Sequence, residues 1–309
     1  MHQQKLTMNK HSIYFAIAIA FCWLRFLYYP GVSEHIFNKY IDGTIERPFC
    51  YRVLTPSVIN CMLSITPNYV SEGLDRYSKQ MTAKGNVVWS LGHFYLAFIS
   101  LFAFLGFYLA FKNLFEEFYQ KDKEIVPIIA LVCMPLMFSY EGHIYDPLQI
   151  FLFTLGTVLA YKNNKWFFPV FILAVLNKET SLLLLWIYYI CNENIKKTFI
   201  YTIVYIVLQS IIRLYFAHNS GSILQFQLGH NLMLLDSPFG WQFILFIALM
   251  ITVFYKWEEK PEFIRKSFWI ALPLVVMAIP FGYVDEARGY LEVYPFAVLS
   301  IYHSLHSKR

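Results

Sequence analysis

The sequence predicts an all-α fold, a polytopic transmembrane bundle of about ten membrane helices that forms a single integral membrane domain over residues 1–309. Hydrophobic residues make up 58% of the chain and charged residues only 15%, whereas a soluble domain of this length carries far more charge. Long apolar runs recur along the chain, and Lys and Arg gather in alternate loops. Inside lipid, helices satisfy the backbone hydrogen bonds within one segment.

The predicted membrane helices follow the apolar runs in order. No small-residue cleavage site follows the first run, so we expect it to remain in the protein as a helix. The runs lie at about 13–29, 86–111, 124–140, 147–161, 166–177, 180–191, 199–216, 241–255, 267–283 and 290–304.

Two parts of the chain are too short or too polar to cross a membrane alone. Segment 53–66 contains Pro56 and Asn60, and we expect it to form a helix that lies in the membrane interface or re-enters it. Runs 166–177 and 180–191 are separated by polar residues, and basic segments flank the pair on both sides. We expect a hairpin whose polar tip reaches into the protein, unless neighbouring residues extend the two runs into full crossings.

The distribution of Lys and Arg predicts that both termini are cytoplasmic. The cytoplasmic segments then hold 15 of the 25 Lys and Arg residues, and the outer loops 141–146 and 217–240 hold none. The exception is a large first outer loop, 30–85, which contains Arg47 and Arg52. The cytoplasmic segments are 1–12, 112–123, 162–165, 192–198, 256–266 and 305–309. This assignment explains the net charge of +5 by basic cytoplasmic segments, so we expect no nucleic-acid partner. The expected partners include the lipids of the surrounding membrane.

Polar residues from separate parts of the chain fall on the predicted outer side. Ionisable residues at membrane depth are costly and are usually functional or paired with one another, so an outer-facing cavity is the expected site. Simpler roles remain open, because Asp146 precedes Pro147 and suits a helix start, and Lys178 and Glu179 could neutralise one another. The outer polar residues include Glu34, His35, Asp42, Glu46, Arg47, Arg52, Glu141, His143, Tyr145, Asp146, His230, Asp236, Asp285, Glu286 and Arg288, with Asn177, Lys178 and Glu179 at the hairpin tip.

Several chemistries lack their sequence signatures. The chain has no HExxH or CxxC motif, no GxSxG motif and no Walker loop. We therefore predict no cofactor and do not expect a metal, although the sequence leaves a divalent metal open. A lipid-borne donor that is reached from the membrane suits this chain better than a nucleotide.

One stretch, YIDGTIERPFCYRVLTPSVIN, resembles a motif of GT-C-type membrane glycosyltransferases, such as the first GPI mannosyltransferase and its bacterial relatives. The matching positions are Gly43, Pro48, Phe49, Tyr51, Arg52 and Pro56. The chain is also similar to small uncharacterised bacterial membrane proteins with YD, N-[Arg/Lys]-E-T-S and E-x-R signatures. Here these signatures are Tyr145-Asp146, Asn177–Ser181 and Glu286–Arg288.

The resemblance implies a glycosyltransferase of the bacterial inner membrane that takes a sugar from a polyprenyl-phosphate lipid donor and passes it to a glycan or lipid acceptor. It also implies interfacial helices and a catalytic carboxylate in the first outer loop. The chain lacks the Asp-x-Asp or Asp-Glu pair usual there, so the choice of base stays open. The candidate catalytic residues are Glu34, Asp42, Asp146 and Glu286. The candidate donor-phosphate or substrate-binding residues are Tyr51, Arg52, His143, Tyr145, Lys178, Glu179, His230 and Arg288.

Two other functions are compatible with the sequence. The interrupted run 166–191 is typical of transporters with broken helices, so a transporter or flippase for a lipid-linked or anionic solute is one alternative. Inverted repeats would favour that alternative, and inspection of the sequence finds none. A membrane assembly subunit without catalysis is the other.

Overall fold

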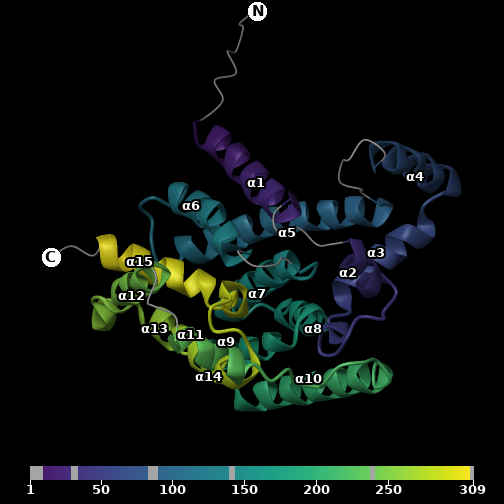
Figure 1. The fold of residues 1–309 in the computed structure, drawn as a ribbon. Coiled ribbons are helices and arrows are strands. Elements are labelled where there is room, and N and C mark those ends of the chain that lie inside the picture. Colours follow the sequence, from purple (N-terminus) through teal and green to yellow (C-terminus); the bar gives the residue numbers. More distant parts are fainter. Residues whose placement is uncertain (1–9, 29–33, 83–89, 139–142, 237–240, 307–309) are drawn as a thin grey trace, which may run out of the picture.

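The computed structural model describes residues 10–28, 34–82, 90–138, 143–236 and 241–306, and within these ranges it contains helices and no strand (Figure 1). The all-α prediction is therefore confirmed. The helices are α1 (Lys10–Tyr28), α2 (Glu34–Ile41), α3 (Leu54–Ile65), α4 (Asn68–Thr82), α5 (Leu91–Glu116), α6 (Ile125–Cys133), α7 (Asp146–Tyr161), α8 (Phe167–Asn177), α9 (Leu183–Asn192), α10 (Ile195–Tyr215), α11 (Leu228–Asp236), α12 (Trp241–Phe254), α13 (Glu262–Phe268), α14 (Ala271–Phe281) and α15 (Tyr294–His306). Short 3₁₀ turns include η1 (Phe49–Tyr51), η2 (Met134–Phe138), η3 (Glu179–Leu182) and η5 (Ala287–Tyr290).

Four helical segments of the described chain are long and apolar enough to cross a membrane. They are Lys10–Leu27, Leu91–Glu116, Ile195–Tyr215 and Glu262–Phe281. The other predicted runs also carry helices, but these are shorter, as in the 16 residues of α7 and the 11 of α8. The long helices expose apolar side chains, including Ile203, Ile206 and Leu214 of α10, which suits contact with lipid.

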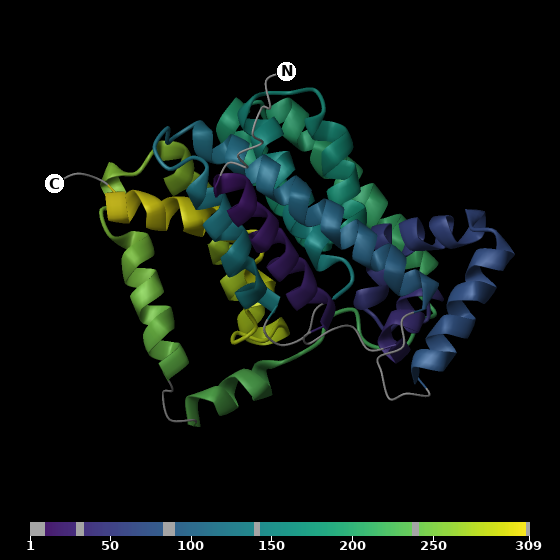
Figure 2. The ribbon, with the colours of Figure 1, turned by 90° about the horizontal axis from the view of Figure 1, so that it is seen from above.

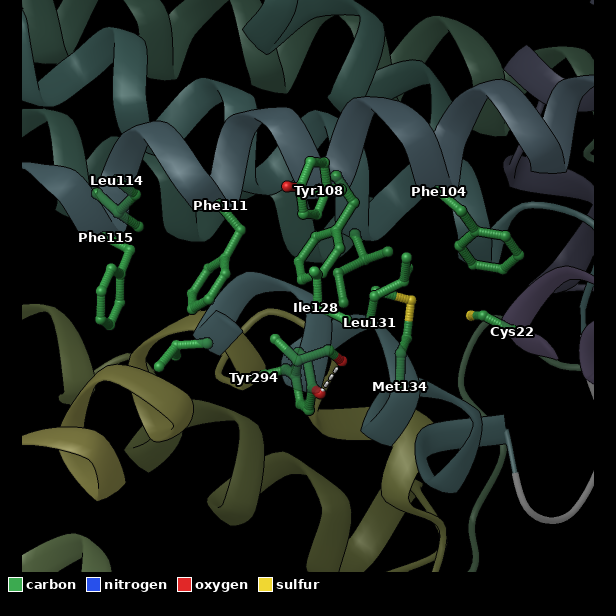
Figure 3. Packing of buried hydrophobic residues seen from close by; sticks show 14 of the residues in the cluster. Cys22, Phe104, Tyr108, Phe111, Leu114, Phe115, Ile128, Leu131, Met134 and Tyr294 are labelled. Atoms are coloured by element: carbon green, nitrogen blue, oxygen red, sulfur yellow. Dashed lines mark hydrogen bonds between the residues drawn. The ribbon is translucent and has the colours of Figure 1, made fainter. Parts of the chain in front are cut away.

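The centre of the bundle is an aromatic core around α5. Phe104, Phe111 and Phe115 lie on one side of α5 and are fully buried against α6 and Tyr294 (Figure 3). The Tyr294 hydroxyl donates to the carbonyl of Ala130, so its one polar atom is satisfied inside the core. This packing fixes α5, α6 and the start of α15 relative to one another.

The close approach of α5 to α7 depends on Gly106. A Cβ at this position would lie 2.5 Å from the Phe151 ring of α7. We expect Gly106→Ala to destabilise the protein by about 1–3 kcal/mol, because a packed core cannot absorb the added methyl group without shifting. Gly73→Ala in α4 is the matched control, since a Cβ there meets nothing within 4 Å. Thermal unfolding in detergent measures both, and an unchanged midpoint for Gly106→Ala would contradict the close contact.

Helices α8 and α9 form the predicted hairpin alongside α7. At its tip, Asn177 donates to the carbonyl of Tyr145, which precedes α7. At its open end, Asn192 donates to the carbonyl of Ala160, in the last turn of α7. The chain therefore runs along α7, turns at η3 and runs back, so its polar tip lies beside the first residues of α7.

The loops of the bundle collect at two opposite ends. At the end that we call the loop end, Arg47 N–H donates to Ser220 and Asn219 donates to Gly43 and Ile45, which joins the segment after α2 to the one after α10. At the other end, the basic end, Lys162 pairs with Glu117. Figures 1 and 2 show α2, α3 and α4 at the loop end, far from the C-terminal turn of α15 at the basic end.

Basic segments 112–123 and 256–266 meet α15 at one end of the molecule. Phe118 stacks on Phe263 of α13, and the hydroxyl of Tyr302 in α15 donates to the carbonyl of Lys121, which brings the segment after α5 together with these two helices. Segment 112–123 and its neighbours at this end are the ones assigned to the cytoplasm from their Lys and Arg content.

The first loop is more structured than the sequence predicted. The expected interfacial segment 53–66 is helix α3, as predicted. Helices α2 and α4 flank it; the resemblance implies interfacial helices in this loop, but the sequence analysis gave bounds for neither of these two. Helix α4 is amphipathic and carries exposed Tyr69 and Tyr77.

Candidate functional site

The hairpin tip is joined to the first loop by an ion pair between Arg52 and Glu179. The Arg52 guanidinium donates through Nη2 to Glu179 Oε1 at 2.8 Å and through Nε to Oε2 at 3.1 Å. It lies over the ring of Tyr145, 4.4 Å from the centroid, and over Phe49 at 5.2 Å. Backbone contact between Val53 and Leu176 holds the two segments in register.

The pair is largely buried, with the Glu179 side chain 27% exposed, and each partner favours the charged form of the other. Burial alone would raise the pKa of Glu179, but the Arg52 guanidinium outweighs it and lowers that pKa to about 2. Burial alone would lower the pKa of Arg52, and Glu179 raises it further above its ordinary value. The side chain of Arg52 is only 10% exposed, and both of its bonded nitrogens face Glu179. The arginine expected to bind a donor phosphate is thus occupied within the protein.

The Tyr145-Asp146 motif forms the start of α7. The carboxylate of Asp146 is 1% exposed, and its Oδ2 accepts the backbone N–H of His143 at 3.1 Å. Helix α7 begins at Asp146 itself, but Tyr145 occupies the N-cap position and no side chain caps the helix, so the predicted capping role of Asp146 is wrong and its carboxylate is available for a second contact. Two buried atoms here, Oδ1 of Asp146 and the hydroxyl of Tyr145, have no hydrogen-bond partner among the residues that the structure describes.

Arg288 supplies that second contact from the loop before α15. Its Nη1 lies 3.9 Å from Asp146 Oδ2, and its Nε donates to the carboxylate of Glu286. The Tyr145-Asp146 and Glu286–Arg288 signatures, more than 130 positions apart in the sequence, therefore form one charged cluster.

Glu292 is a buried carboxylate that the sequence analysis did not select. It is fully buried, and its Oε1 lies 3.4 Å from Lys178 Nζ and accepts from Gln149 at 3.0 Å and from Thr180. Lys178 and Glu179 therefore have separate partners and do not neutralise one another. The sequence offered one indication of a buried role for Glu292, which is that this acidic residue lies at the start of an apolar run.

A cavity of about 570 Å³ opens above this network at the loop end. Its volume lies in the range of small-molecule sites. Both signs of charge line it, together with two histidines and two aromatic rings. The lining residues are Ile36, Lys39, Ile45, Glu46, Phe49, His143, Gln225, His230, Tyr283, Asp285, Glu286 and Arg288.

The predicted site residues divide into three groups in the structure. His143, His230, Glu286 and Arg288 line the cavity. Arg52, Tyr145, Asp146, Lys178 and Glu179 belong to the polar network beside it. The third group lies outside both the cavity lining and the network and consists of Glu34, Asp42 and Tyr51. The two carboxylates are exposed at the surface, and Tyr51 is buried with the guanidinium of Arg213 over its ring. Glu141 and the side chain of Asp236 lie outside the described residues.

The lining also includes residues that sequence reasoning missed. Lys39, Phe49 and Gln225 were not candidate site residues, and each comes from a different segment. Among the described residues, no group of three or more His, Cys, Asp or Glu side chains could hold a metal ion.

Comparison of the chain with models of protein families, with curated proteins and with solved structures finds no match.

Proposed function

We propose that the protein is a membrane glycosyltransferase that transfers a sugar from a polyprenyl-phosphate donor in the loop-end cavity. The observation that carries this proposal is the cavity itself. It lies at one end of an apolar helical bundle and has Arg288 and Lys39 in its wall together with the carboxylates of Glu46, Asp285 and Glu286. A sugar phosphate needs cations for its phosphate and acceptors for its hydroxyl groups.

In this proposal Arg288 holds the donor phosphate. The acceptor oxygen attacks the anomeric carbon, the bond from that carbon to the phosphate oxygen breaks, and polyprenyl phosphate leaves with the electron pair. Fixed cations stabilise the charge that develops on the leaving phosphate. Glu286 takes the proton from the acceptor hydroxyl. Of the four candidate catalytic carboxylates named from the sequence, Glu286 is the one that lines the cavity.

Asp146 has a supporting role in the same scheme. It is buried behind Arg288 and fixes the guanidinium from the side away from the cavity. Arg52 acts further from the ligand, because its bond to Glu179 holds the first loop on the hairpin tip. The phosphate contact first expected of Arg52 is therefore assigned to Arg288.

We place the cavity on the periplasmic face of a bacterial inner membrane, with both termini in the cytoplasm, because the basic segments lie at the opposite end. In a variant without the exposed Cys61, we expect Gln225→Cys to react with a membrane-impermeant maleimide in intact cells. Lys162→Cys should react only after the membrane is permeabilised. The reverse pattern would overturn the orientation and, with it, a periplasmic site.

Transfer is tested with purified protein in lipid nanodiscs and a panel of radiolabelled polyprenyl-phosphate sugars. The expected result is release of polyprenyl phosphate and appearance of labelled acceptor. Arg265→Gln at the basic end is a matched control, because Arg265 pairs with the exposed Glu258 far from the cavity. Absence of transfer with every donor, from protein that binds the donor, would overturn the enzymatic function.

A transporter or flippase for an anionic lipid is the second candidate, and the hairpin of α8 and α9 favours it. The polar tip of this hairpin carries a buried ion pair, as broken helices of transporters do. Vesicles that contain the protein separate the two functions. A flippase moves an intact labelled lipid across the bilayer, whereas the transferase leaves the lipid in place and removes its sugar.

A further inference from the structure

His143 is held in the cavity wall by three aromatic side chains. Its ring stacks with two of them, with the Phe49 centroid 5.1 Å away at an interplanar angle of 16° and the Tyr145 centroid 5.2 Å away at 12°. Its Nδ1 lies 2.8 Å from the hydroxyl oxygen of Tyr40 in α2. The residue is 7% exposed and lines the cavity.

These contacts leave one part of the imidazole for a ligand. Phe49 and Tyr145 stack on the ring, and Tyr40 closes its Nδ1 edge, so Nε2 is the ring nitrogen that remains for a ligand in the cavity. Within the described chain, Nε2 has no hydrogen-bond partner. The position of the ring is thus fixed before any ligand binds.

The Tyr40 contact also selects the tautomer. Tyr40 is 2% exposed, and a buried tyrosine hydroxyl needs an acceptor for its hydrogen. Nδ1 of His143 is the acceptor within reach, so the hydroxyl donates to it. A neutral imidazole that accepts at Nδ1 carries its hydrogen at Nε2. The cavity therefore meets an N–H donor at this position and not a basic nitrogen.

We propose that Tyr40 and His143 form a positioning pair for a phosphate oxygen, in which Tyr40 fixes the tautomer and Nε2–H of His143 donates to the phosphate of the ligand beside Arg288. This inference rests on the proposed function for the identity of the ligand. It excludes His143 as the general base, since the nitrogen that faces the cavity already carries its proton.

The first test is nitrogen NMR on protein labelled with ¹⁵N-histidine in nanodiscs. Wild-type His143, assigned by its loss in His143→Gln, should show a protonated Nε2 and an unprotonated Nδ1 near neutral pH. Tyr40→Phe removes the donor and should give a mixture of tautomers. Tyr95→Phe, whose hydroxyl bonds to Thr66 outside the cavity lining, is the matched control. A wild-type ring protonated at Nδ1 alone would overturn the pair.

The second test is the binding of polyprenyl phosphate, compared with polyprenol and with inorganic phosphate. We expect Tyr40→Phe to weaken binding of the lipid phosphate by roughly 3- to 10-fold, the value of one hydrogen bond. His143→Gln, whose amide can donate in place of Nε2–H, should keep more affinity than His143→Leu. Equal affinity for polyprenol and polyprenyl phosphate, or equal affinity of all four proteins, would overturn the phosphate contact.

The two tests separate this inference from the proposed function. Phosphate-dependent binding that is weakened in Tyr40→Phe, together with no transfer, supports the pair and overturns the transferase. Transfer with unchanged donor affinity and unchanged rate in Tyr40→Phe overturns the pair and leaves the transferase in place. Inorganic phosphate that competes as well as the lipid would identify a soluble anion as the ligand in place of a lipid headgroup.

Discussion

Replacing Arg52 with alanine should destabilise the protein by about 2–4 kcal/mol and lower its activity as a consequence. The substitution leaves the Glu179 carboxylate, whose side chain is only 27% exposed, without its cation, and removal of one partner of a largely buried pair is destabilising. It also removes the guanidinium that lies over the Tyr145 and Phe49 rings. The unfolding midpoint in detergent should fall by roughly 5–15 °C.

A double variant distinguishes a structural role of Arg52 from contact with a ligand. Arg52→Met combined with Glu179→Leu removes both charges and should recover much of the lost stability, because an apolar pair of similar volume often replaces a buried ion pair without loss. A folded Arg52→Ala protein that binds donor more weakly would instead support the direct phosphate contact first expected from the sequence.

The same pair predicts how stability depends on pH. The folded pKa of Glu179 lies near 2, below its ordinary value of 4.5, so the pair contributes fully above about pH 4.5. The contribution is lost as the pH falls from 4.5 through 2. Glu179→Gln should therefore lose less stability than the wild type over this window, and parallel curves for the two proteins would show that the pair does not form.

The all-α class and the positions of most helices could be predicted from composition and from the apolar runs. Apolar runs must be helical in lipid, so each predicted run carries a helix, and the polar residues at 177–180 mark the turn of the hairpin. Helices α2 and α4 are amphipathic but too polar on average to appear as apolar runs, and α11 is short. Runs 147–161 and 166–177 correspond to α7 and α8 almost residue for residue, and both helices are shorter than the four segments that are long enough to cross a membrane.

The sequence predicted which charged residues belong to the candidate site better than it predicted their contacts. The distribution of Lys and Arg assigned Asp146, Glu286 and Arg288 to the same end of the bundle, and in the structure these three residues contact one another. Sequence could not show that Arg52 is bound by Glu179, since that pairing depends on how the first loop docks on the hairpin. Nor could it show that Glu34 and Asp42 face away from the cavity, because that depends on the docking of α2 and the chain after it.

The largest effect on activity is expected for Arg288→Gln, which should lower transfer from a polyprenyl-phosphate donor by about 100- to 1000-fold. Arg288 lines the cavity, and a fixed cation at a developing phosphate charge contributes about 3–4 kcal/mol to the transition state. Arg288→Lys should recover part of the rate, because lysine keeps the charge without the two-pronged hydrogen bonding of arginine. The measurement is the initial rate of transfer at saturating acceptor, with kcat and KM separated.

Loss of folding must be separated from loss of chemistry, since Arg288 also faces the buried carboxylate of Asp146. Adding Asp146→Asn to Arg288→Gln removes the more deeply buried of the two carboxylates that lose their cation, and it should restore part of the unfolding midpoint while leaving transfer impaired. Arg265→Gln should keep the rate within about twofold, as expected for a pair at the basic end. If Arg288→Gln transfers sugar within threefold of the wild type, the phosphate contact lies elsewhere in the cavity. Lys39 is then the remaining cation in its wall among the described residues.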